Sequence, residues 1–548
     1  MRLDVERLLG EMTIEEKVGQ LFLLAFDAAN ADAAETLFER HFVGGSYLSN
    51  DNLPSPAAAA AMTARIQGYA GRTRLGLPVL LGADQEGAWS VMYPASCPGP
   101  GNMALGATGD PDHARAMYRV IGEEVRAVGL HATFGPCADC NSNPANAIIG
   151  TRSFGERAEL VAAMTEAAVA GAMGAGAIAT LKHYPGHGDT TTDSHRGLPT
   201  VERGRDELFA TDLLPFARGV AAGAQLVMTA HILFPALDRE RPATLSPVIL
   251  NDILRGELGF DGVVISDSMN MASMRANYDP VDAATQAINA GVDIVMLAEE
   301  HYDHDRDYLA RQTALIEGVR EAVRSGRLGE ARLDEAVGRV LRLKTSVPER
   351  SLAPETVGSP EHRSVELAAA EAAMALLRGA GELLPAHANM PPTLVNTTGR
   401  EAYRILGATR GIGPNQTDAA FDLFVEAVRR RAPGARAVPA EDVLSGDIPG
   451  GDELLVAVTE NHPLPGTDFD ISGRDDVLTA LHRSGRRVLV VALRDPYELE
   501  DLDEVTDYLC AFGPRWCSAE AAARVLFGEA EPVGASPVSI PGSGIEAR

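Results

Sequence analysis

The sequence predicts an α/β protein of two domains, an N-terminal (β/α)8 barrel followed by a smaller layered α/β domain. Through residues 1–347, short apolar runs alternate with helical segments rich in Ala, Glu and Arg. Such alternation is typical of parallel strands joined by helical crossovers. There are eight of these runs, the number of strands that closes a barrel. A proline-containing stretch then precedes a second, shorter set of apolar runs.

The eight apolar runs supply the predicted barrel strands, and amphipathic segments lie between them. Residues 111–128 and 157–173, for example, have the helical spacing of apolar positions. Near the N-terminus, Thr13 followed by Glu16 three residues later predicts a capped helix start. The predicted strands are 20–26, 43–48, 79–82, 131–135, 177–181, 226–229, 262–265 and 293–297.

The prolines at 348, 354 and 360 set the predicted domain boundaries. We expect the barrel at residues 1–347, a linker at 348–364 and the C-terminal α/β sandwich domain at 365–548. A helix is predicted at 365–377, and strands at 393–395, 454–458, 488–493 and 508–512. Fewer strands than in the barrel indicate a smaller layered domain.

Charge and the N-terminal residues limit the partners and the compartment. With 48 basic and 76 acidic residues, the net charge is −28, which disfavours nucleic acid and anionic membranes as partners. The first residues lack the basic and apolar segments of a secretory signal, and the longest apolar stretch, 160–181, is mostly Ala and Gly and carries Glu166. Five cysteines, an odd number, suit a reducing compartment. We therefore expect a cytoplasmic protein, and the oligomeric state stays open.

The most informative stretch is the polar run at residues 182–195, which directly follows a predicted buried strand. It contains three histidines, two aspartates and a lysine, together with glycine and proline residues that prevent regular structure. Polar connectors are common on protein surfaces, but few hold so many titratable groups. A loop at the end of a buried strand is where a rigid scaffold usually carries chemistry.

Polar side chains also follow the neighbouring predicted strands. Because the βα loops of a barrel form one rim, we expect these side chains to converge there. A mixture of donors and a charged acceptor suits the hydroxyl groups of a sugar, which predicts an enzyme with a polar substrate. The residues are Asp84 after strand three, Arg152 after strand four, Lys182 and His183 after strand five, His231 after strand six and Asp267 after strand seven.

Two carboxylates and one imidazole could carry the chemical steps. Asp267 ends a predicted buried strand, so its carboxylate would be rigid and partly desolvated, as a nucleophile requires; the alternative is a helix cap. Asp193 lies two residues before His195 and can hold that ring by a hydrogen bond. A neighbouring carboxylate raises the pKa of a histidine, which gives a proton donor and acceptor near neutral pH. The alternative for this pair is a surface turn.

A metal site is the competing interpretation of the same stretch, since histidine and carboxylate side chains suit divalent metals. Cys137 and Cys140 also form one C-x-x-C pair, which without a second pair is weak evidence for zinc or redox chemistry. The candidate ligands in the polar run are His183, His187, Asp189, Asp193 and His195.

Several long motifs occur in a fixed order along the chain. They lie at residues 12–21, 141–144 with 149–155, 182–190 continuing to 195, and 266–271. On these motifs the chain resembles glycoside hydrolase family 3, and within it the bacterial β-N-acetylglucosaminidases. Residues 490–497 and 522–528 resemble that family's second domain, so the resemblance spans nearly the whole chain.

The resemblance implies a role for each candidate residue. Asp267 would be the nucleophile that forms a covalent glycosyl-enzyme, and His195, paired with Asp193, would be the general acid/base. This pair replaces the second carboxylate of the usual retaining scheme but moves the same protons. No cofactor and no metal is implied. The residues implied to bind the sugar are Asp84, Arg152, Lys182, His183 and His231.

One motif departs from the family pattern. Where relatives usually have Asp-x-Glu-Gly-Gly-Arg-Val-x-Arg, this chain has Trp89 and Met92 at the two arginine positions. The loss of two multi-donor guanidinium groups is not conservative, and Trp89 could offer a stacking face. We therefore expect an altered sugar or aglycone preference with the catalytic machinery retained.

The activity expected from the resemblance is that of a retaining exo-β-N-acetylglucosaminidase. Its substrate would be terminal β-linked GlcNAc of cell-wall- or chitin-derived oligosaccharides. A phosphorylase that opens the glycosyl-enzyme with phosphate is one alternative, because a histidine repels phosphate less than a carboxylate does. A sugar-binding protein without catalysis is another, although binding alone needs neither Asp267 nor His195.

Overall fold

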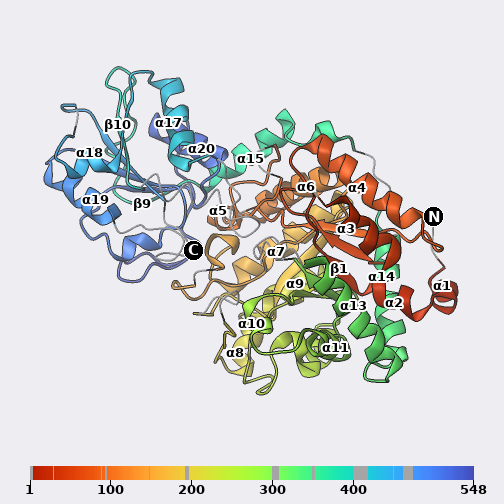
Figure 1. Ribbon diagram of the computed structural model, residues 1–548. Helices are drawn as coiled ribbons and strands as arrows, with labels where there is room; N and C mark the ends of the chain where they lie inside the picture. Colours follow the sequence, from red (N-terminus) through yellow and green to blue (C-terminus); the bar gives the residue numbers. More distant parts are fainter. Residues whose placement is uncertain are drawn as a thin grey trace.

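In the computed structural model the described residues are 4–28, 30–87, 89–92, 95–146, 148–191, 197–298, 308–348, 352–398, 418–448, 450–460 and 473–548. Within them the chain forms two sheets, a closed parallel barrel and an open mixed sheet. The sheets belong to two lobes, with the barrel in red to green and the smaller lobe in blue (Figure 1). The predicted fold class is confirmed.

The barrel strands follow the chain in order, and each pairs in parallel with the next. β8 closes onto β1, where Leu23 is in register with Met296. Each predicted apolar run overlaps one strand, and β3, β5 and β7 extend beyond the predicted ends. Among the described residues the barrel consists of β1 (Phe22–Leu24), β2 (Gly45–Tyr47), β3 (Leu80–Ala83), β4 (Ala132–Thr133), β5 (Ile178–Tyr184), β6 (Leu226–Thr229), β7 (Val263–Ser268) and β8 (Ile294–Leu297).

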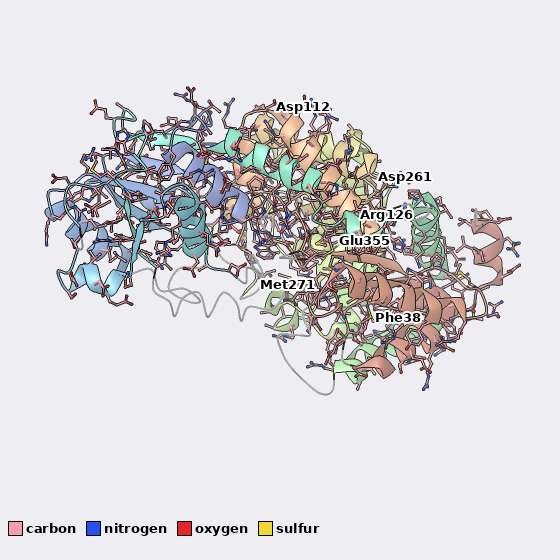
Figure 2. All side chains as sticks on the ribbon, turned by 90° about the horizontal axis from the view of Figure 1, so that it is seen from above. Phe38, Asp112, Arg126, Asp261, Met271 and Glu355 are labelled. Carbon is pink, nitrogen blue, oxygen red and sulfur yellow. The ribbon has the colours of Figure 1, made fainter. Side chains whose placement is uncertain are left out.

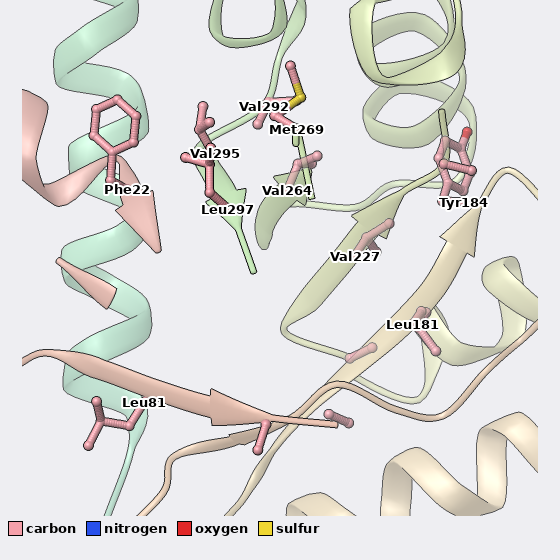
Figure 3. Close-up of a cluster of buried hydrophobic side chains, with 14 of the residues drawn as sticks. Phe22, Leu81, Leu181, Tyr184, Val227, Val264, Met269, Val292, Val295 and Leu297 are labelled. Atoms are coloured by element: carbon pink, nitrogen blue, oxygen red, sulfur yellow. The ribbon is translucent and has the colours of Figure 1, made fainter. Parts of the chain in front are cut away.

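Successive strand residues face opposite sides of the barrel wall, as the two-residue period of a strand requires. Leu23 and Ile265 belong to the cluster inside the barrel. Phe22 and Val264 belong instead to the layer between strands and helices, part of which is drawn in Figure 3. Burying one such side chain contributes roughly 1.5–3 kcal/mol, so both layers fix the strand register and with it the rim.

Helices surround the barrel and begin at recognisable caps. At the start of α2, Thr13 Oγ1 accepts a hydrogen bond from Glu16 N and Glu16 Oε2 accepts one from Thr13 N, as predicted. The helical elements of this lobe are α1 (Val5–Glu11), α2 (Ile14–Gln20), α3 (Ala31–Glu35), η1 (Thr36–Arg40), α4 (Pro56–Gly71), α5 (Asn102–Ala107), α6 (Pro111–Ala127), η2 (Gly150–Arg152), α7 (Ala158–Gly174), α8 (Arg205–Ala210), α9 (Leu213–Ala221), η3 (Ala243–Leu245), η4 (Val248–Glu257), α10 (Ala272–Arg275), α11 (Pro280–Ala290), α13 (Tyr308–Arg324) and α14 (Glu330–Ser346).

The second lobe is a sheet in the order β11-β10-β12-β13-β14-β9, parallel except for the edge strand β9. Helices cover it on both sides (Figure 1). The elements are α15 (Pro360–Ala373), β9 (Ala375–Arg378), β10 (Thr393–Asn396), α17 (Ala420–Arg431), β11 (Arg436–Val438), α18 (Ala440–Leu444), β12 (Leu455–Thr459), α19 (Gly473–Arg483), β13 (Val488–Ala492), η6 (Tyr497–Glu500), β14 (Tyr508–Cys510) and α20 (Trp516–Leu526).

The helix predicted at 365–377 is wrong at its C-terminal end. α15 ends at Ala373, and the next apolar residues form β9, in which Leu376 pairs with Leu509 of β14. A run of Ala and Leu has high helix propensity. Here, however, the segment pairs with the open edge of the sheet and becomes a strand.

The two lobes are joined by the segment that follows α14, and α15 packs against both. Arg126 of α6, labelled in Figure 2, donates hydrogen bonds to Leu130 O at 2.8 Å and to Pro348 O at 2.5 Å. Ala369 of α15 belongs to the barrel core, whereas its neighbour Ala370 belongs to the core of the second lobe. The 3-10 turn η5 (Pro354–Thr356) lies between α14 and α15.

None of the helices in the described segments combines the length and the apolar character needed to cross a membrane.

Candidate active site

The predicted site residues lie at the carboxyl ends of the barrel strands. Asp84 directly follows β3, Lys182 and His183 lie near the end of β5, and Arg152 lies in η2 of the loop after β4. Because the strands are parallel, these ends share one rim. The rim therefore gathers the polar side chains, as predicted.

Glu86 connects two of these residues, and sequence reasoning missed it. The Arg152 Nε donates to Glu86 Oε1 at 2.8 Å, and Lys182 Nζ lies 3.1 Å from Glu86 Oε2. Lys182 also donates to Asp84 Oδ1 at 2.6 Å. Glu86 has an exposed fraction of 0% and Arg152 of 3%, so these charges are removed from water and compensate one another. The available signal was the D-x-E spacing after strand three.

The two cations remain charged in spite of their burial. Burial by itself lowers the pKa of Lys182, but the nearby Asp84 and Glu86 carboxylates outweigh it and the net pKa is raised. For Arg152, burial likewise lowers the pKa and Glu86 raises it above the ordinary value. Two fixed positive groups therefore stand beside Asp84, whose other oxygen, Oδ2, accepts from the Tyr47 hydroxyl at 3.0 Å.

Asp139 holds His183 in one tautomer. Its Oδ2 lies 2.8 Å from His183 Nδ1, and its carboxylate accepts the backbone N–H groups of His183 and His187. Arg152 Nη2 lies 3.2 Å from His183 Nε2; arginine can only donate, so Nε2 accepts and the ring proton is on Nδ1. Burial would raise the pKa of Asp139, but His183 and the other donors hold it below its usual value. Sequence reasoning missed Asp139, which lies between Cys137 and Cys140 in the C-x-x-C pair.

Cys137, Asp139 and His183 form a group whose potential ligand atoms lie within 4.8 Å of one another. Their hydrogen bonds are already directed at each other, since the Cys137 thiol donates to Asp139 Oδ2 at 3.0 Å. Burial raises the pKa of Cys137, which opposes the thiolate that a metal needs. The donor set therefore fits an internal hydrogen-bond cluster better than a metal.

The other proposed metal ligands in the described chain are held by separate partners. His187 Nδ1 lies 2.8 Å from Thr190 Oγ1, and Asp189 Oδ1 accepts from Arg203 Nη2 at 3.0 Å. Asp193 and His195 lie outside the described residues. Their predicted role in proton transfer stays a prediction.

Asp267 occupies the end of β7, within the strand and away from a helix cap. α10 begins five residues later and has Met271 as its N-cap. Asp267 Oδ1 accepts the backbone N–H of Ser268 at 2.7 Å, and the residue is partly exposed. A partly exposed carboxylate held on a rigid strand suits a nucleophile.

His231 lies beside the strand that carries Asp267. Its Nε2 donates to the Ser268 carbonyl at 3.0 Å, and its Nδ1 lies 2.8 Å from the Thr244 hydroxyl. The ring is 1% exposed. These contacts fit a residue that fixes the end of β7 next to Asp267.

The barrel lobe matches the sequence of a known protein family. The model of the glycosyl hydrolase family 3 N-terminal domain matches residues 13–343. The chain belongs to glycosyl hydrolase family 3. It is therefore a glycoside hydrolase, and the resemblance described from its motifs is confirmed.

Two of the following relatives match nearly the whole chain, and one matches about half of it. Beta-hexosaminidase A of Pseudoalteromonas piscicida is 30% identical, over 92% of this chain and 90% of that protein. A beta-hexosaminidase of Stenotrophomonas maltophilia (strain K279a) is 39% identical over 46% of this chain and 76% of its own length. The solved structure of a family 3 beta-N-acetylglucosaminidase from Paenibacillus sp. str. FPU-7 has a TM-score of 0.83 at 32% identity, covering 96% of this chain and 99% of that one.

The departure from the family 3 pattern lies against Arg152, one of the predicted sugar-binding residues. The Trp89 ring lies 3.7 Å below the Arg152 guanidinium carbon and packs against the small apolar cluster of Cys137, Ile148 and Ile149. Met92 is buried, with an exposed fraction of 5%. One face of the Trp89 ring therefore stacks on the Arg152 guanidinium.

Proposed function

We propose that this family 3 protein is a retaining exo-β-N-acetylglucosaminidase that removes terminal β-linked GlcNAc from cell-wall- or chitin-derived oligosaccharides. The observation that carries the proposal is Asp267, a carboxylate fixed at the end of β7 on the rim that also holds the Asp84–Lys182–Glu86–Arg152 network. The β-hexosaminidases and the β-N-acetylglucosaminidase among the relatives support the choice of sugar.

In the proposed reaction the network orients the sugar and Asp267 attacks it. Asp84 would accept hydroxyl protons, while Lys182 and Arg152 would donate to the sugar oxygens and His183, through Nε2, would hold Arg152 at the sugar. Attack of Asp267 on C1 breaks the glycosidic bond as His195, held by Asp193, donates a proton to the leaving oxygen. Water then gives its proton to His195, attacks C1 and releases Asp267, so two displacements retain the configuration. His231 would support this step by holding the Ser268 carbonyl.

Replacing the nucleophile tests the proposal most directly. Asp267→Asn is expected to lower kcat on p-nitrophenyl β-N-acetylglucosaminide by at least about 10⁴-fold, because the covalent intermediate cannot form. Asp261→Asn is the control, since Asp261 is an exposed aspartate just before the same strand (Figure 2). An activated 5-fluoro N-acetylglucosaminide should leave a covalent adduct on Asp267 in a peptide digest. An adduct on another residue would refute the assignment.

The same assay separates the alternatives. A panel of p-nitrophenyl glycosides, run with and without phosphate, distinguishes GlcNAc from glucose and hydrolysis from phosphorolysis. We expect free sugar and no sugar 1-phosphate. Activity should survive prolonged chelation, whereas its loss would favour the metal-dependent alternative.

A cytoplasmic location is proposed together with this activity. Each of the five cysteines, all of them in the described part of the chain, is a buried free thiol. Free thiols suit a reducing compartment, in which recycled cell-wall fragments would be the substrate.

A further inference from the structure

The loop that carries Arg152 is contacted by the second lobe. Asn141, in the loop after β4, donates from Nδ2 to the hydroxyl of Tyr497 at 2.7 Å. Tyr497 begins η6, which follows β13 in the second sheet. Asn141 is 0% exposed, and burial raises the pKa of Tyr497 so that its hydroxyl stays neutral. A partly buried side-chain hydrogen bond therefore crosses from one lobe to the other.

Asn141 in turn shapes the turn that presents Arg152. Its Oδ1 accepts from Gly150 N at 3.1 Å, which starts η2, and its backbone N–H donates to Gly155 O at 2.8 Å. The loop between these two points contains Arg152. Because Asn141 bonds to both ends of this turn, a shift of its side chain would move the guanidinium.

A second contact from the C-terminal tail reaches the same loop. Glu156 accepts from Ser539 N at 2.8 Å and from Ser539 Oγ at 2.6 Å, and its own N–H donates to Pro537 O. Gly155 allows this approach, since a Cβ there would lie 2.6 Å from the Pro537 carbonyl oxygen. The turn is thus held by the second lobe at both of its ends.

We infer that Tyr497 and Ser539 are positioning residues for Arg152, so that the second lobe sets the sugar affinity of the barrel without touching the sugar. The family match ends at residue 343 and includes neither of them. The inference rests on the proposed role of Arg152 in sugar binding. The physical basis of the inference is geometric. Arg152 makes hydrogen bonds to Glu86 and His183 and stacks on Trp89, and a displaced turn would break these contacts.

Tyr497→Phe removes only the hydroxyl that Asn141 needs. We expect KM for p-nitrophenyl β-N-acetylglucosaminide to rise roughly three- to tenfold, as for loss of one hydrogen bond that leaves a buried amide unpaired, with a smaller change in kcat. Ser539→Ala should act in the same direction. The controls are Tyr308→Phe, whose hydroxyl accepts from Gln312 at 2.6 Å, and Ser543→Ala, whose hydroxyl donates to Ile540 O at 2.8 Å. Both controls should leave KM unchanged.

A double-mutant cycle separates positioning from general destabilisation. In an Arg152→Ala background, Tyr497→Phe should change KM by less than about twofold, because the group that Tyr497 positions is absent. Independent effects of the two substitutions on KM would overturn the inference.

A second readout needs no substrate and so stays valid if the proposed sugar is wrong. The chain has two tryptophans, and Trp89 stacks on Arg152. In a Trp516→Phe background the emission therefore reports Trp89 alone. Tyr497→Phe should shift that emission and Tyr308→Phe should not. An unchanged spectrum with a folded protein, verified by circular dichroism, would also overturn the inference.

Discussion

The guanidinium of Arg152 contacts four groups of different kinds. Within its plane, it donates to Glu86 at 2.8 Å and to Ile148 O at 3.3 Å, and it reaches His183 at 3.2 Å. Trp89 covers one face at 3.7 Å. A stacked ring excludes water from the face and leaves the in-plane donors aligned, which a second arginine could not do without repulsion.

Removing the stacking ring should weaken sugar binding. Trp89→Leu is expected to raise KM on p-nitrophenyl β-N-acetylglucosaminide by roughly tenfold, since a desolvated cation–π contact contributes up to about 2 kcal/mol. Trp89→Phe keeps a ring and should lose less. Steady-state kinetics on the three proteins measures this. Equal KM values for wild type and the Leu variant would show that Trp89 does not order Arg152.

The site could be predicted from sequence where position along a strand decided it. Asp84, Lys182 and Asp267 lie at strand ends, and strand ends were visible as the limits of apolar runs. Glu86 and Asp139 act through contacts with distant residues, such as Glu86 with Arg152 66 positions later. The order of residues along the chain does not show which distant residue a side chain contacts, so the roles of Glu86 and Asp139 became clear only in the structure.

Helix α14 brings a buried amine to the end of the barrel opposite the site. Lys344 is 7% exposed and donates to Gln20 Oε1 at 2.6 Å. Val340 and Leu343 of the same helix belong to the cluster inside the barrel. Burial lowers the pKa of Lys344 from 10.5 to about 7. Between these two values the unfolded chain binds more protons than the folded one, so stability rises with pH from about 7 toward 10.5.

Lys344→Met should remove this pH dependence. Below pH 7 the buried ammonium costs roughly 4–5 kcal/mol at 1.36 kcal/mol per pKa unit, whereas a thioether of similar length costs little. Loss of the donor to Gln20 offsets about 1 kcal/mol. The variant should therefore be the more stable protein at pH 6.5, with the difference vanishing toward pH 10. Urea unfolding at pH 6.5 and pH 10 measures the free energy of unfolding of both proteins. An equal difference between them at the two pH values would contradict the lowered pKa of Lys344.

Elements were predictable from sequence where an apolar run stood alone. β12 and β13 are fully buried, and their Leu and Val residues mark them clearly. β11 has two exposed residues, Arg436 and Ala437, and so contains no apolar run that predicts a strand. β9 continues the Ala-rich segment of α15, so only its pairing with β14 distinguishes it from helix.

At the scale of the whole molecule, α15 belongs to two cores at once. Ala369 packs in the barrel core and Ala370 in the core of the second lobe. Glu366, also on α15, accepts from Gly99 N of the barrel at 3.0 Å and from Trp516 Nε1 of the second lobe at 2.7 Å. Unfolding of either lobe would expose part of the other, so the lobes should unfold together.

Scanning calorimetry should therefore show one transition for the wild type. Ala369→Asp places a carboxylate in the barrel core, at a cost of several kcal/mol, and should split the transition in two. Ala368→Asp is the control. The Ala368 side chain, next to Ala369 on the helix, is exposed, so this substitution should leave a single transition. Two separate transitions in the wild type would show that α15 does not couple the lobes.

The five buried thiols make the molecule convenient for spectroscopy. Burial raises the pKa of Cys97, Cys137, Cys140, Cys510 and Cys517, and a buried neutral thiol does not react with maleimides. One cysteine introduced on the surface of each lobe could thus carry a fluorescent dye in an otherwise native protein. Energy transfer between the two dyes would then follow the separation of the lobes during turnover.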